Sequence, residues 1–266
     1  AASDVYKRQH LDCVSAERIQ EELLKLLAAP RPGSYLEPAV LAVVLPELEP
    51  EKQPERFAEL CRTIDRIEPT AENVPARLAA LLYPLGEAGA RKALRKLKCS
   101  NALTDEVTAL EREAGGGAGS FLLGHESGHS IARPIACGNR VPPQRTVLGE
   151  TPGTPNTTLT VQAKRLLGRY ELPTIQRLTA LCSARHPEQA EAFSALQAEA
   201  ERLTAENACC RVSQLAVNGR DLMAAGVRPG PGLRQVLNAL LEAVITGQTP
   251  NEKDALLAAA ARFSAS

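Results

Sequence analysis

The sequence has no tryptophan, only four phenylalanines and four tyrosines, and a single methionine among its 266 residues. Aromatic residues supply 3% of a chain that is 44% hydrophobic, so a buried core has to be built from Leu, Ala, Val and Ile. Such a core suits helices. Segments of alternating hydrophobicity, which would indicate strands, are missing as well. These features predict an all-α fold.

Net charge and long apolar runs are also lacking. The 31 basic and 31 acidic residues cancel, so no global field attracts the protein to nucleic acid or to an anionic membrane. Any site for a polyanion must therefore be local. The longest apolar run, around residues 38–46, is less than half of the ~20 residues that a membrane-spanning helix needs.

No Cys-x-x-Cys motif occurs, although the chain has seven cysteines. Apart from Cys209 and Cys210 they are spread singly, their number is odd, and no secretory signal is visible. This pattern indicates reduced thiols and predicts a cytoplasmic protein. Cys61 and Cys182 lie at helical core spacing, which favours a packing role.

Helical periodicity begins after residues 1–10, which have no clear period and are treated as an unassigned N-terminal segment. Ser15 is a candidate N-cap, and the next residues place an apolar stripe on one face of a helix. Ser100 or Asn101 caps another helix, and Pro75 opens one. The other helical patterns lie at 54–67, 87–98, 161–170, 172–184, 187–203, 232–247 and 251–263.

The helical pattern breaks between residues 114 and 160, where "AGGGAGS", "VPPQR" and "TPGTPNTT" occur without a sustained period. The Gly, Pro, Ser and Thr content of this insert or linker favours disorder. The predicted domains are therefore a helical neck and body at 11–113, the insert at 114–160, and a helical tail at 161–266.

Within the insert, "HESGH" has the His-Glu-x-x-His spacing of zinc peptidases, with His125, Glu126 and His129 as the matching residues. Gly128 alone costs about 1 kcal/mol in a helix interior. The candidates for a third ligand lie in the same Gly/Pro-rich stretch, without a helix to hold them. We interpret the motif as a chance match and predict no metal ligand, with a zinc metallopeptidase as the less favoured alternative.

Three stretches resemble one family. Residues 15–27 contain Arg-x-x-x-Glu, and residues 77–101 end in a Leu-Lys-x-Ser-Asn junction. Residues 217–257 contain a Gly-x-Asp-Leu step, a Gly-x-x-Pro-Gly-Pro turn, and Asn-Glu before a Leu pair. Together they resemble the neck, body and tail of bacterial CCA-adding tRNA nucleotidyltransferases of the poly(A) polymerase type, over roughly 11–113 and 160–262. The matching residues are Arg18, Glu22, Gly219, Asp221, Leu222, Gly226, Pro229, Gly230, Pro231, Asn251 and Glu252.

The resemblance implies a function in tRNA 3′-end maturation. In the family, two carboxylates on a β-sheet head bind magnesium and align the tRNA 3′-hydroxyl with CTP or ATP. That head would precede residue 15, so we expect the catalytic head to be missing, no catalytic residue in this chain, and no polymerisation by the chain alone. Magnesium, ATP and CTP are implied for the complete family enzyme only. Arg18 and Glu22 would steady the neck below the nucleotide site.

One departure from the family concerns the body. Some relatives carry a His-Asp metal pair in "LLHDIGK", whereas this chain has "LLYPLGE", with Tyr83 and Pro84 at the corresponding place. Neither residue replaces an imidazole or a carboxylate as a metal ligand. Phosphohydrolase activity is therefore not predicted.

Basic residues are the candidate contacts to the acceptor and T-arm of tRNA, which the family binds through phosphates and shape. A helix beginning near Pro231 would offer free N–H groups as a phosphate seat. The alternatives are a solvated helix face, a turn that only joins two helices, and a helical interaction scaffold without a role in RNA binding. The candidates are Arg91, Lys92, Arg95, Lys96, Lys98, Lys164, Arg165, Arg169, Arg220, Arg228, Gly230 and Arg234.

Overall fold

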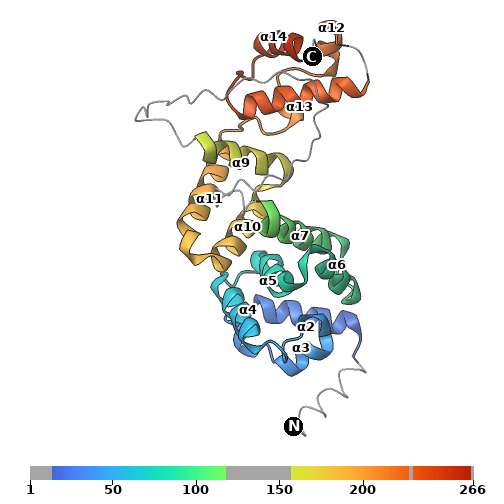
Figure 1. Ribbon diagram of the computed structural model, residues 1–266, viewed down its shortest axis with the longest axis vertical. Helices are drawn as coiled ribbons and strands as arrows, with labels where there is room; N and C mark the ends of the chain where they lie inside the picture. The colour runs from blue at the N-terminus through green and yellow to red at the C-terminus, as the bar shows by residue number, and fades with distance from the viewer. Residues whose placement is uncertain (1–13, 118–156, 228–229, 265–266) are drawn as a thin grey trace, which may run out of the picture.

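The computed structural model describes residues 14–117, 157–227 and 230–264 (Figure 1). Within these ranges every regular element is a helix and no strand occurs, so the predicted all-α fold is confirmed. The insert's central part and the HESGH residues lie outside the described residues. The α-helices are α2 (Ala16–Ala28), α3 (Pro38–Val44), α4 (Pro54–Arg66), α5 (Val74–Leu82), α6 (Gly86–Lys96), α7 (Asn101–Arg112), α9 (Thr157–Arg169), α10 (Leu172–Arg185), α11 (Ala190–Ala205), α12 (Gly219–Ala224), α13 (Pro231–Ile245) and α14 (Lys253–Ser264).

Short helical turns connect several of these helices. Helix α7 continues into a π-helical turn, η5 (Glu113–Gly117), and α9 begins at Thr157, so helical structure extends into both ends of the stretch predicted as an insert. The 3-10 turns used below are η1 (Pro32–Tyr35), η4 (Tyr83–Leu85) and η7 (Val212–Gln214).

Local sequence signals account for the helix starts. The Ser15 hydroxyl accepts a hydrogen bond from the Arg18 N–H, and the Ser100 hydroxyl accepts one from the Leu103 N–H at 3.2 Å. Both caps were predicted, and each satisfies an N–H group that has no partner inside its helix. Proline opens α4, α5 and α13, where its missing N–H costs no helical hydrogen bond.

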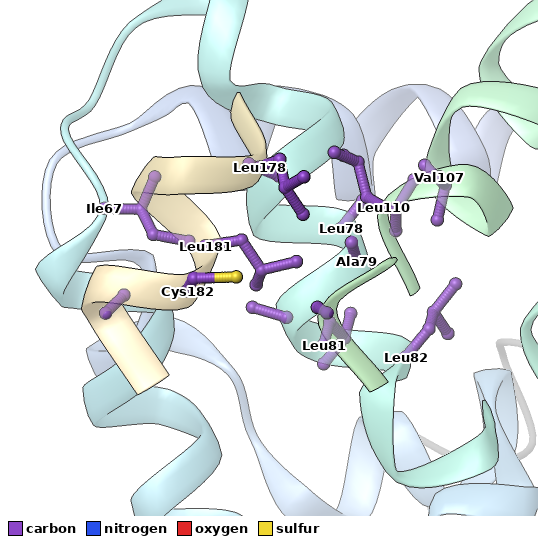
Figure 2. Packing of buried hydrophobic residues seen from close by; sticks show 14 of the residues in the cluster. Ile67, Leu78, Ala79, Leu81, Leu82, Val107, Leu110, Leu178, Leu181 and Cys182 are labelled. Atoms are coloured by element: carbon purple, nitrogen blue, oxygen red, sulfur yellow. The ribbon is translucent and has the colours of Figure 1, made fainter. Parts of the chain in front are cut away.

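A large hydrophobic cluster, the body cluster, joins helices from both sides of the insert. Leu78 and Leu82 of α5 are fully buried, and they pack against Leu110 of α7 and Leu181 of α10 (Figure 2). Cys182 is also buried here, which confirms its packing role, and Cys61 is half-buried against the same cluster. The cluster runs along the chain from Leu23 to Cys210, so α9, α10 and α11 share a core with the neck and body.

A buried arginine connects the neck helix to the body. Arg77 of α5 has no exposed surface. Its Nε and Nη2 atoms donate to the Ile67 carbonyl, while Nη1 donates to Leu27 at 2.6 Å and Ala29 at 2.8 Å. These carbonyls lie at the C-terminal ends of α2 and α4, where helix dipoles place partial negative charge. The guanidinium therefore compensates two helix ends at once.

A second hydrophobic cluster, the tail cluster, forms between α12, α13 and α14. Its buried residues extend from Leu215 to Ala260, and none of them belongs to the body cluster. Side-chain packing thus divides between Cys210 and Leu215, whereas the domain boundaries drawn from the sequence stay a prediction. No described helix is long and apolar enough to cross a membrane.

Motif residues of the tail make structural hydrogen bonds. The Asn251 side chain accepts from the Ala216 N–H at 2.9 Å and donates to the Gln214 carbonyl at 3.0 Å. Asp221 accepts from the Asn218 N–H and forms an ion pair with Lys253 at 2.7 Å. These bonds tie the segment before α12 to the start of α14, so both motif residues hold the tail together.

Candidate nucleic-acid interface

A hollow lined by basic side chains lies between α9 and α13. It has a volume of about 560 Å³ and is lined by three arginines, Arg165, Arg169 and Arg211. Figure 1 shows these two helices side by side, where the body and tail clusters meet. We call this hollow the arginine groove. Its other lining residues are Gly168, Cys210, Val212, Ser213, Asn238, Leu241, Glu242 and Ile245.

Each arginine of the groove contacts a carboxylate. Arg165 of α9 pairs with Glu242 of α13, Arg169 pairs with Glu113 at 3.3 Å, and Arg211 pairs with Glu171 at 2.7 Å. Of the lining residues, Glu242 alone is acidic. Each guanidinium group of the groove therefore has a carboxylate partner within the protein.

A close approach of two backbones shapes the groove. A Cβ atom built on Gly168 would lie 2.8 Å from the Cys210 carbonyl oxygen. Glycine at this position therefore lets the loop before η7 approach α9, and the Arg211 Nε donates to the Leu167 carbonyl at 3.1 Å. The loop brings Arg211 beside Arg165 and Arg169.

The sequence predicts a weaker basic patch of Lys164, Arg165 and Arg169, and it does not predict Arg211. Arg211 lies 42 positions after Arg169, outside any basic run, so no local signal marks it. The structure brings Arg165 and Arg169 together as predicted. Lys164 does not line the groove and is half-buried.

The basic stretch at 91–98 is less uniform than its spacing suggests. Arg91 donates to Asp105 at 3.2 Å and to Thr108 at 2.9 Å on α7, and the Lys96 ammonium donates to the Val44 carbonyl at 3.4 Å. These two residues join helices. Lys92, Arg95 and Lys98 are exposed, so they form the part of the stretch that faces solvent.

The predicted phosphate seat at the start of α13 has the expected helix start. Gly230 is the N-cap with a φ of 137°, a backbone conformation that favours glycine. Arg220 and Arg234 are exposed. Arg228 lies outside the described residues, and the seat itself stays a prediction.

The neck motif, Arg18 and Glu22, lies on α2. Glu22 pairs with Lys25 at 2.9 Å, and no ion pair joins it to Arg18 among the described contacts. Both motif residues line an apolar hollow of about 250 Å³ between α2 and η1–α3, beside Tyr35, which is 67% exposed. Their role under a nucleotide site stays a prediction.

Tyr83, at the position of the family's His-Asp pair, contacts an arginine. The Arg185 guanidinium lies over the Tyr83 ring, 3.1 Å from its centroid. Glu111 of α7 is 3% exposed, and its Oε1 atom has no hydrogen-bond partner among the described residues. Burial raises the pKa of Glu111 to about 8, and nearby Arg185 opposes this shift.

Cys61 and Cys182 are weak candidates for nucleophiles. Burial raises the pKa of Cys61 to about 11 and that of Cys182 to about 12, so these thiols stay protonated at neutral pH. No group of three His, Cys, Asp or Glu side chains that could hold a metal ion occurs among the described residues. His125, Glu126 and His129 lie outside them.

A family of known proteins is similar to the region around the arginine groove. Residues 166–260 match the family model described as tRNA nucleotidyltransferase domain 2, putative. This match runs from α9 to α14 and includes Arg169, Arg211 and Glu242. The resemblance to tRNA nucleotidyltransferases found in the sequence is therefore confirmed.

Curated relatives carry related names. A CCA-adding enzyme of Levilactobacillus brevis is 62% identical over 45 residues, which cover 17% of this chain and 11% of the relative. A CC-adding tRNA nucleotidyltransferase of Shouchella clausii is 35% identical over 100 residues, 38% of this chain and 21% of the relative. A CCA-adding enzyme of Lacticaseibacillus paracasei is 37% identical over 75 residues, 28% of this chain and 16% of the relative. Each alignment thus covers about a fifth of the relative or less, and no solved structure matches the chain.

Proposed function

We propose that this chain, which carries a tRNA nucleotidyltransferase domain 2 at residues 166–260, is the tRNA-binding part of a CCA-adding enzyme. The observation that carries the proposal is the coincidence of that match with the arginine groove. Three guanidinium groups line a hollow of about 560 Å³, on a chain whose formal charge is zero. Arginine forks match phosphate geometry, so the groove suits an RNA backbone read by shape.

The ligand is the acceptor and T-arm of tRNA. A stem contacts a protein chiefly through phosphates and 2′-hydroxyls, which require basic side chains on a shaped surface. The arginine groove supplies them at the junction of the two clusters, and the exposed Lys92, Arg95 and Lys98 supply a second, weaker surface on the body.

Two double variants test the groove. Arg165→Gln with Arg169→Gln removes two charges from the groove, and Lys52→Gln with Arg62→Gln removes two exposed, carboxylate-paired charges from the neck and body. We expect the groove variant to weaken tRNA binding at least tenfold. The slope of log K against log salt should fall by roughly one for each arginine removed. The control variant keeps wild-type binding. Equal effects of the two variants would refute a specific groove.

In this proposal, catalysis is carried out by the complete family enzyme with magnesium, ATP and CTP. The catalytic head of that enzyme docks at the hollow lined by Arg18, Glu22 and Tyr35. Exposed apolar surface at that hollow supports a docking role. The chain alone then adds no CMP or AMP to a tRNA that lacks its 3′ end. Incorporation of labelled nucleotide by the purified chain would contradict this assignment.

The docking role is tested by Tyr35→Asp. If this variant still co-purifies with a family head domain, the docking role is wrong.

A further inference from the structure

Glu242 occupies an unusual position for an acidic residue. It lies on α13 inside the arginine groove, and its Oε1 atom contacts the Nη2 atom of Arg165 on α9. The carboxylates that hold Arg169 and Arg211, on Glu113 and Glu171, do not line the groove. Arg165 is therefore the groove arginine whose charge is cancelled from within the groove.

We propose that Glu242 is a phosphate-mimicking latch, which holds Arg165 until an RNA phosphate displaces it. This inference rests on the proposed function of the groove. A guanidinium binds carboxylate and phosphate through the same pair of parallel N–H groups, so the two anions compete for one position. The Arg165 and Glu242 side chains are 37% and 48% exposed, and an ion pair at such exposure contributes little to stability. A phosphate can therefore replace the carboxylate at small cost.

The latch also joins the two clusters. Arg165 lies on the body side and Glu242 on the tail side of the junction, and α9 contacts α13 near this pair. The chain itself crosses the junction between Cys210 and Leu215, and Cys210, Arg211 and Val212 of this crossing line the same groove. Displacement of Glu242 thus removes an ion pair from the contact between the clusters at the moment when RNA enters it.

An ion pair that only supports the fold has different consequences. Its removal would lower stability and leave RNA affinity unchanged or reduced. A latch that competes with phosphate would raise affinity when it is removed. It would also steepen the dependence of affinity on salt, because in the unmodified protein the released Glu242 takes up a cation and offsets part of the counterion release.

The test compares Glu242→Gln with Glu59→Gln in the full chain, using unmodified tRNA at several salt concentrations. Glu59 is 52% exposed and pairs with Arg62 and Arg66 on α4, so its replacement frees arginines outside the groove and changes net charge equally. We expect Glu242→Gln to bind tRNA about three- to fivefold more tightly, with a steeper slope of log K against log salt. Glu59→Gln should behave like the wild type.

The outcomes separate the latch from the function on which it rests. If the wild type binds tRNA and Arg165→Gln weakens binding, but Glu242→Gln matches Glu59→Gln, the latch is wrong and the groove stands. A gain that persists in the Arg165→Gln, Glu242→Gln double variant also overturns the latch, since the gain must act through Arg165. If no variant binds tRNA, the proposed function and the latch fail together. Urea unfolding of each variant verifies that folding is intact.

Discussion

A single guanidinium ties three helices together in the neck and body. Arg77 donates to carbonyls at the ends of α2 and α4 from its position on α5, and it has no contact with solvent. The sequence does not predict this role of Arg77, because a lone arginine in an apolar helix has the same local pattern whether it extends to the surface or caps neighbouring helices.

Replacement of Arg77 by methionine should lower the free energy of unfolding by about 3 kcal/mol or more, because the buried Leu27 and Ile67 carbonyls and the part-buried Ala29 carbonyl lose their donor. Arg62→Met, at an exposed ion pair on α4, should cost less than about 1 kcal/mol. Urea unfolding followed by circular dichroism measures both. Equal losses in the two variants would show that the Arg77 hydrogen bonds do not stabilise the fold.

Glu111 makes stability depend on pH. Its pKa in the folded protein is about 8, above the ordinary value of 4.5, because burial disfavours the carboxylate. The folded state therefore holds this proton more tightly than the unfolded state, and the stability that the proton contributes is complete below pH 4.5 and is lost as pH rises through 8. We expect Glu111→Gln to flatten the decline in unfolding free energy between pH 5 and pH 8. If the unfolding free energy changes with pH by the same amount in the wild type and in Glu111→Gln, the pKa shift of Glu111 is excluded.

Among whole elements, the sequence predicts starts and buried faces better than partners. Ser15, Ser100, Pro75 and Pro231 mark helix starts correctly, since a helix start depends on residues within one turn. Arg91 shows the limit of such patterns. Its place in a basic run does not reveal that it donates to Asp105 and Thr108 on the neighbouring helix, because contacts between helices are set by packing that no local period encodes. Its contact with RNA stays a prediction.

The meeting of α9 with the loop before η7 gives a prediction for one element. Gly168→Ala places a Cβ 2.8 Å from the Cys210 carbonyl, so helix and loop must separate, at a cost of about 1–3 kcal/mol. Gly232→Ala on α13 meets nothing within 4 Å and should be neutral or slightly stabilising. Thermal unfolding of the two variants measures the difference. A Gly168→Ala protein as stable as Gly232→Ala would mean that the approach is not tight.

At the scale of the whole molecule, two clusters meet at a basic groove. Composition predicts the all-α class, and motifs at both ends of the chain show the resemblance to tRNA nucleotidyltransferases. Neither predicts the groove. Arg211 comes from a loop, Arg165 and Arg169 come from α9, and Glu242 comes from α13, so the site exists only after distant segments pack. The sharing of one core by α5, α7 and α10 across the insert was equally hidden, because periodicity identifies a buried face and not the face that covers it.

The most direct test of the account is a titration of this chain with unmodified tRNA at two salt concentrations. We predict binding at low salt that weakens steeply as salt rises, with a slope that reports the number of phosphate contacts. Absence of binding at low salt, or binding that salt does not affect, would contradict the account and favour a helical interaction scaffold without a role in RNA binding.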